Sequence, residues 1–143
     1  MAGHTTRISS PWSAHKAFEY VADVNNAPLW DPRISEVVTE IADGPELGAR
    51  YLATSNGRVY ECIITSYDSP RRVVVEASVS LLQARNIIEV EPMGGGCTII
   101  HETTCELRGP AVLLTPLSAT MLRRIMESRG VGLATALNGV VVS

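Results

Sequence analysis

Cysteine is scarce in this chain, and the spacing of the few cysteines carries no motif. The three residues are Cys62, Cys97 and Cys105. No pair has the CxxC spacing of a zinc or redox site, and any disulfide scheme leaves one thiol unpaired. All three lie in apolar stretches, where a free cysteine behaves as a small buried hydrophobic residue. The sequence therefore predicts reduced thiols in the core.

Histidine is equally scarce. The three residues are His4, His15 and His101. Their separations do not match the spacing of ligands in zinc sites. We therefore expect no metal site, and no motif in the chain indicates a bound cofactor.

Long hydrophobic runs and an excess of positive charge are also missing. No stretch reaches the roughly 18 consecutive apolar residues that a membrane-spanning helix needs. The first four residues, MAGH, lack the charged-then-apolar pattern of a secretory signal. A net charge of −3 gives no basic surface for nucleic acid or an anionic membrane. We expect a cytoplasmic protein with no nucleic-acid partner and no membrane span.

The chain is long enough for one domain with a substantial core. Its 143 residues are 45% hydrophobic. A chain of this length buries about 70% of the surface that its unfolded form exposes. We therefore expect one domain over residues 1–143.

The clearest helical pattern lies over residues 110–138. Apolar residues recur there at steps of three and four, the spacing of one helix face: Leu114, Leu117, Met121, Ile125, Leu133 and Leu137. The polar residues between them are predicted to face solvent: Ser118, Arg123, Arg124, Glu127 and Arg129. Gly130 and Gly132 lie inside this run. They either kink or fray the helix, or leave room for a ligand or a partner.

The start of the chain predicts a short strand and one amphipathic helix. The strand covers residues 5–9. Ser9 or Ser10 offers the N-cap of the helix, Pro11 lies near its first position, and the helix runs to about Val24. Two prolines in residues 25–32 predict that the helix breaks there and a tight turn follows.

From Arg33 onward the hydrophobic period changes to two. We predict six strands, separated by turn signals, at residues 34–41, 49–55, 58–67, 72–80, 86–92 and 97–107. The glycines at 94–96 predict a hairpin turn rather than a phosphate loop, because no Lys-Ser/Thr follows them. Short connections make consecutive strands antiparallel neighbours. The fold class is therefore α+β, with the sheet covering the long helix.

Five segments of the chain, taken in order, form a pattern typical of one superfamily. They are SSPWSAHKAFEYVADVNNAPLWDP, PELGARY, ITSYDSPRRVVV, EPMGGGCTIIHET and LRGPAVLLTPL. Their order resembles the START-like superfamily of polyketide cyclases/dehydrases and lipid-transport proteins (SRPBCC). The resemblance implies a helix-grip fold: a seven-stranded antiparallel sheet curved around a long C-terminal helix, with two short helices after the first strand. It also implies a deep cavity between sheet and helix for an apolar or polyaromatic ligand.

Strand alternation predicts which side chains face such a cavity. Glutamates on these strands are expected to face water, so their neighbours face inward. The inward set is Tyr60, Cys62, Ile64, Val73, Val75, Ala77, Val79, Asn86, Ile88, Val90, Ile99, His101, Thr103 and Cys105. Apolar walls with a few polar groups are typical of a pocket for an organic ligand.

The polar and aromatic residues near this cavity are the candidate site. We predict ligand contacts from Trp30, Arg33, Tyr51, Tyr60, Asn86, His101 and Thr103. Packing alone is the alternative for Trp30 and the two tyrosines, and a surface position is the alternative for Arg33. His101 is also the candidate for acid–base catalysis, because the ordinary pKa of histidine lies near neutrality. A core histidine, or a ligand contact without chemistry, are the alternatives. No Ser-His-Asp set, GxSxG elbow or inward carboxylate pair is present, which argues against a hydrolase.

Three functions are compatible with these features. The first is binding of a small hydrophobic or aromatic molecule, polyketide- or lipid-like, by a monomer or homodimer. The second is a polyketide cyclase, aromatase or dehydratase in which a cavity His or Tyr transfers a proton. The third is a protein-interaction module. The resemblance places the first two on the same cavity and does not choose between them.

Overall fold

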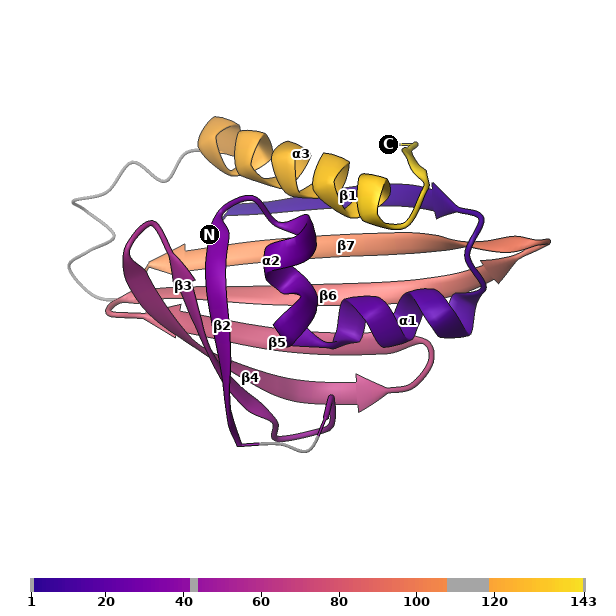
Figure 1. Cartoon of the computed structure of the whole chain (residues 1–143). Coiled ribbons are helices and arrows are strands. Elements are labelled where there is room, and N and C mark those ends of the chain that lie inside the picture. Colours follow the sequence, from indigo (N-terminus) through magenta and orange to yellow (C-terminus); the bar gives the residue numbers. More distant parts are fainter. Residues whose placement is uncertain (1, 42–43, 108–118, 143) are drawn as a thin grey trace.

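The computed structural model describes residues 2–41, 44–107 and 119–142 (Figure 1). The strands in these ranges are β1 (Ala2–Ser10), β2 (Ile34–Ile41), β3 (Arg50–Ser55), β4 (Arg58–Asp68), β5 (Arg72–Val79), β6 (Leu82–Met93), β7 (Gly96–Leu107) and β8 (Val140–Val141). The helical elements are α1 (Ala14–Ala22), the 3-10 turn η1 (Val24–Asn26), α2 (Ala27–Trp30) and α3 (Ala119–Ala136).

The strands form one antiparallel sheet in the order β2-β3-β4-β5-β6-β7-β1-β8. The sheet curves, and α3 lies across its inner face beside β1 (Figure 1). Positive φ angles of 52° at Asn56 and 75° at Gly57 close the hairpin between β3 and β4, as a two-residue turn requires. The predicted α+β class and helix-grip arrangement are confirmed.

The sheet has eight strands, so the predicted count of seven is wrong. The additional strand, β8, pairs with the end of β1 through Val141 opposite Ile8 and Val140 opposite Ser9. Asn138 adopts a φ of 54° after α3, which turns the chain back toward β1. A strand of two residues has no periodicity, which is why the pattern did not reveal it.

The first N-terminal helix, α1, begins later than the sequence indicated, and two further helical segments, η1 and α2, follow it. The N-cap of α1 is Ser13, whose Oγ accepts a hydrogen bond from the Lys16 N–H at 3.2 Å. Ser9 and Ser10 instead belong to β1, so both predicted N-caps are wrong. The predicted turn at residues 25–32 contains η1 and α2, with a proline in the first turn of α2. The helices α1 and α2 are the two short helices after the first strand that the resemblance implied.

The two glycines of α3 allow close contacts with neighbouring backbone and side chains. A Cβ atom on Gly132 would lie 2.0 Å from the carbonyl oxygen of Trp30. On Gly130 it would lie 2.8 Å from Cγ2 of Thr6. Close packing therefore accounts for both glycines, rather than a kink or space for a ligand. The start of the predicted helix, before residue 119, lies outside the described residues.

The core fills the space between the sheet, α1 and α3. Its largest fully buried side chains include Phe18 on α1, Ile64 and Ile99 on the sheet, and Leu133 and Leu137 on α3. Within the described ranges, no helix has the length and apolar character that crossing a membrane requires.

Candidate functional site

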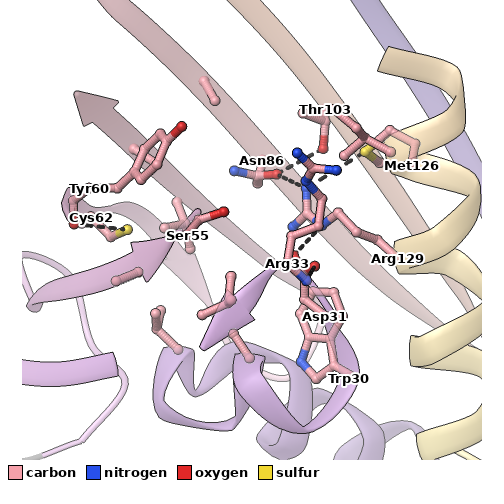
Figure 2. A pocket seen from close by; sticks show the side chains of 18 of the residues that line it. Trp30, Asp31, Arg33, Ser55, Tyr60, Cys62, Asn86, Thr103, Met126 and Arg129 are labelled. Atoms are coloured by element: carbon pink, nitrogen blue, oxygen red, sulfur yellow. Dashed lines mark hydrogen bonds and ion pairs between the residues drawn. The ribbon is translucent and has the colours of Figure 1, made fainter. Parts of the chain in front are cut away.

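A cavity of about 240 Å³ lies between the inner face of the sheet, α2 and α3 (Figure 2). Its wall is mostly apolar, with contributions from Ile34, Ala53, Val75, Ala77, Ala84, Ile88, Ile125 and Met126. Its polar residues are Asp23, Asp31, Arg33, Ser55, Asn56, Tyr60, Asn86, Thr103 and Arg129. This combination of apolar walls and a few polar groups is typical of sites for small organic molecules.

Strand alternation placed the inward-facing residues well. The following line the cavity: Tyr60, Cys62, Val75, Ala77, Asn86, Ile88, Thr103 and Cys105. Others of the set are buried in the core outside the cavity wall: Ile64, Val73, Val90, Ile99 and His101. Only Val79, at the end of β5, belongs to neither group, and it is half-buried.

The structure brings five of the seven candidate site residues into the cavity wall. They are Trp30, Arg33, Tyr60, Asn86 and Thr103. The side chain of Arg33 is exposed, so this residue marks the opening of the cavity. Tyr51 and His101 are fully buried and lie outside the wall.

Tyr51 packs in the core rather than at the cavity surface. It is 1% exposed, and its hydroxyl has no hydrogen-bond partner among the described residues. Desolvation raises its pKa above the ordinary tyrosine value, and the charges of Asp23 and Glu46 act in the same direction. Its ring contributes packing to this region.

Arg129 is the main polar residue of the cavity wall that the sequence did not indicate. We predicted that it faces solvent, but its side chain is only 14% exposed and it lines the cavity. The signal was present in the spacing, because Arg129 follows Ile125 and precedes Leu133 by four residues each. It therefore lies on the apolar stripe of α3. The prediction placed Arg129 in solvent because its side chain is charged.

A buried ion pair holds Arg129 in place. Its Nε lies 2.7 Å from Oδ2 of Asp31, whose side chain is 4% exposed. The guanidinium also lies 5.5 Å from the centre of the Trp30 ring, within the range of a cation–π interaction. The pair joins α3 to the segment that follows α2.

A chain of hydrogen bonds continues from Arg129 into the sheet (Figure 2). Arg129 Nη1 donates to Oδ1 of Asn86 at 3.2 Å and to the sulfur of Met126 at 3.6 Å. The hydroxyl of Thr103 donates to the same Asn86 oxygen at 2.8 Å. His101 Nε2 lies 3.4 Å from the Thr103 hydroxyl. Asn86 is therefore held from two sides by side chains of α3 and β7.

His101 lies behind the cavity wall and is completely buried. Its ring meets the Trp30 ring edge-on at 6.0 Å, and Nδ1 has no partner among the described residues. Desolvation holds its pKa well below the ordinary histidine value, and the charges of Arg129 and His4 act in the same direction. The imidazole is therefore neutral at neutral pH.

This neutral burial predicts a specific loss of stability in acid. The unfolded chain binds a proton at His101 with a pKa of about 6.5, whereas the folded protein does not. Stability is therefore fully present above about pH 6.5 and falls at lower pH by up to about 1.4 kcal/mol per unit. Urea unfolding at about pH 7 and about pH 5 should show this slope. The His101→Leu variant should lose it, and equal slopes in the two proteins would contradict the interpretation.

The cysteines do not form a reactive site. Cys62 and Cys97 are buried, Cys105 is half-buried, and all three are free. Desolvation raises the pKa of Cys62 to about 11. A thiol of this pKa is protonated at neutral pH and is a weak nucleophile. In the described part of the chain, no group of three His, Cys, Asp or Glu side chains is arranged to hold a metal ion.

Comparison with known proteins establishes the family. Residues 1–138 match the family model for polyketide cyclase/dehydrase and lipid transport. The chain belongs to this family. The description of this family, polyketide cyclase/dehydrase and lipid transport, names both enzymes and carriers. A search of curated proteins finds no match to the chain.

Solved structures share the fold of this family member at low sequence identity. A START superfamily protein from Mycobacterium smegmatis is 14% identical with a TM-score of 0.75, over 96% of this chain and 98% of that one. Ara h 8.0201 is 16% identical with a TM-score of 0.66, over 95% and 98%. The di-domain ARO/CYC StfQ from the steffimycin biosynthetic pathway is 15% identical with a TM-score of 0.71, over 95% of this chain and 50% of that one. These similarities show the shared fold.

Proposed function

We propose that this protein binds a small hydrophobic or aromatic molecule in the cavity between the sheet and α3. The observation that carries the proposal is the composition of the wall, in which apolar side chains predominate and the polar groups include a linked cluster of Asp31, Asn86, Thr103 and Arg129. Such a wall stabilises an apolar molecule by removing its surface from water, and the polar groups orient it. The proposal treats residues 1–143 as one ligand-binding domain.

The size of the cavity limits the ligand. Pockets for drug-sized molecules have volumes of about 300–1,000 Å³, and this cavity has about 240 Å³. A molecule with one or two rings suits this volume. The proposal therefore favours a compact ligand over a long acyl chain.

A cyclase or dehydratase activity is the second candidate, and Tyr60 is the observation that favours it. Tyr60 lines the cavity and is half-buried, and its hydroxyl has no partner among the described residues. A phenol in this position can donate a proton to a ligand carbonyl. His101 is less suited to this role because it lies outside the wall and is neutral. Release of a chemically changed molecule would favour catalysis over binding.

Filling the cavity tests the proposal. Ala77 lines the cavity, and its neighbour Ser78 is exposed on the other face of β5. We expect Ala77→Phe to weaken binding of the apolar probe tetralin at least about tenfold, because the new ring occupies the ligand volume. Isothermal titration calorimetry measures the affinity, and circular dichroism checks that each variant is folded.

The matched control places the same ring outside the cavity. Ser78→Phe should bind tetralin as the unmodified protein does. Equal affinities in folded Ala77→Phe and the unmodified protein would contradict a site in this cavity.

A further inference from the structure

We infer that the molecule held in this cavity carries an uncharged, hydrogen-bond-accepting oxygen, such as a ring ketone, placed against Asn86 and Arg129. The inference rests on the proposed function, since it names the ligand class for the same site. Two observations support it. Asn86 and Arg129 have N–H donors without an acceptor, and the formal charges of the cavity wall cancel.

The side chain of Asn86 offers the cavity donors rather than an acceptor. Its Oδ1 already accepts hydrogen bonds from Thr103 Oγ1 and Arg129 Nη1. A guanidinium has only donors, so the amide atom that it contacts must be the oxygen, which fixes the orientation of the amide. The amide nitrogen Nδ2 has no acceptor in the parts of the chain that the structure describes, although Asn86 lines the cavity.

Arg129 also has donors left over. Its Nε is paired with Asp31, and its Nη1 is shared between Asn86 and Met126. No described residue accepts a hydrogen bond from Nη2, and this atom, unlike Nε, is not sealed within the protein. Asn86 and Arg129 therefore present N–H groups next to each other, and a ligand oxygen between them can accept from both.

The charge balance of the wall favours a neutral ligand. The wall contains two arginines, Arg33 and Arg129, and two aspartates, Asp23 and Asp31, so the formal charges cancel. Asp31 directly compensates Arg129. A ligand carboxylate would give this largely apolar cavity a net negative charge, which is more costly than burying a hydrogen-bonded carbonyl. An ammonium group would find no acceptor at Asn86 or Arg129.

The Arg129–Asp31 pair is also largely shielded from water, with side chains 14% and 4% exposed, which strengthens the preference. Desolvation is the largest cause of the shift in the pKa of Arg129 and lowers this pKa. The charge of Asp31 raises it. A buried donor without an acceptor is unfavourable. A hydrocarbon of the right shape leaves these donors unsatisfied, whereas a ketone satisfies them.

Three bicyclic probes of the same skeleton test this inference by calorimetry: tetralin, α-tetralone and the corresponding tetralin carboxylate. We expect α-tetralone to bind about tenfold more tightly than tetralin, the gain from one to two net hydrogen bonds. The carboxylate should bind more weakly than the ketone. Equal affinities for tetralin and α-tetralone, or a carboxylate that binds more tightly than the ketone, would overturn the inference.

Two neighbouring substitutions on β6 locate the preference. Asn86→Leu removes the amide donors and should clearly reduce the preference for α-tetralone over tetralin, leaving only the contribution of Arg129. Arg85 is exposed and precedes Asn86 on the strand, so Arg85→Leu should keep the tenfold preference. An undiminished preference in Asn86→Leu would also overturn the inference. If none of the three probes binds, the proposed function fails, whereas equal binding of tetralin and α-tetralone contradicts only this inference, so the two failures are distinguishable.

Discussion

Neutralising Asp31 should destabilise the protein more than most single substitutions. Asp31→Asn leaves the Arg129 charge without its partner in a site where the two side chains are 4% and 14% exposed. Loss of one member of a buried pair costs about 3–5 kcal/mol, and we expect about 3 kcal/mol because Arg129 keeps some contact with solvent. Urea unfolding monitored by circular dichroism measures this change in the free energy of unfolding.

Two controls separate the buried charge from other effects. The double variant Asp31→Asn, Arg129→Met removes both charges, and it should recover much of the lost stability. Glu61→Gln breaks the surface pair of Arg50 and Glu61, whose side chains are 42% and 48% exposed. That change should cost less than about 1 kcal/mol. An Asp31→Asn cost no larger than that of Glu61→Gln would show that the pair is not a structural anchor.

Gly132→Ala should also destabilise the protein, although alanine is the better helix former. In an unconstrained helix the substitution stabilises by about 0.5–1 kcal/mol. Here the added Cβ would lie 2.0 Å from the Trp30 carbonyl oxygen, so α3 and the segment around α2 must move apart. Overpacking of this kind costs about 1–3 kcal/mol, and we expect about 2 kcal/mol. Thermal and urea unfolding give the value.

Substitutions of two other glycines serve as controls for Gly132→Ala. Gly95 has no atom within 4 Å of its added Cβ, so Gly95→Ala should be close to neutral. Gly130→Ala meets only the end of the Thr6 side chain at 2.8 Å, which can move, so it should cost less than Gly132→Ala. A Gly132→Ala variant more stable than the unmodified protein would show that α3 is not held against Trp30.

Much of the fold was predictable because the strands obey one simple rule. A residue on a half-buried strand faces water or the interior according to its parity, and the glutamates marked the outer face. The residues predicted to face inward on β6 and β7, from Asn86 to Cys105, accordingly lie in the core or the cavity wall. The two-residue turn at Asn56 was also predictable from local sequence, because Asn followed by Gly readily adopts the positive φ angles that this turn requires.

The remaining features depend on contacts between distant segments. The sequence alone predicts Arg129 on the surface, because its partner Asp31 lies almost 100 positions earlier in the chain and only the fold brings the two together. The strand β8 forms because the end of β1 has a free edge next to the end of α3. Gly132 is required by the approach of the Trp30 backbone. Local propensity contains no information about such pairings.

The most direct test of the account is to locate a bound probe within the folded protein. Intermolecular nuclear Overhauser effects between α-tetralone and methyl groups report which side chains lie beside the ring. We expect cross-peaks to the cavity methyl groups of Val75, Ile88 and Met126. Cross-peaks only to exposed residues such as Val38 and Val59, or no cross-peaks at a saturating concentration, would contradict a ligand site between the sheet and α3.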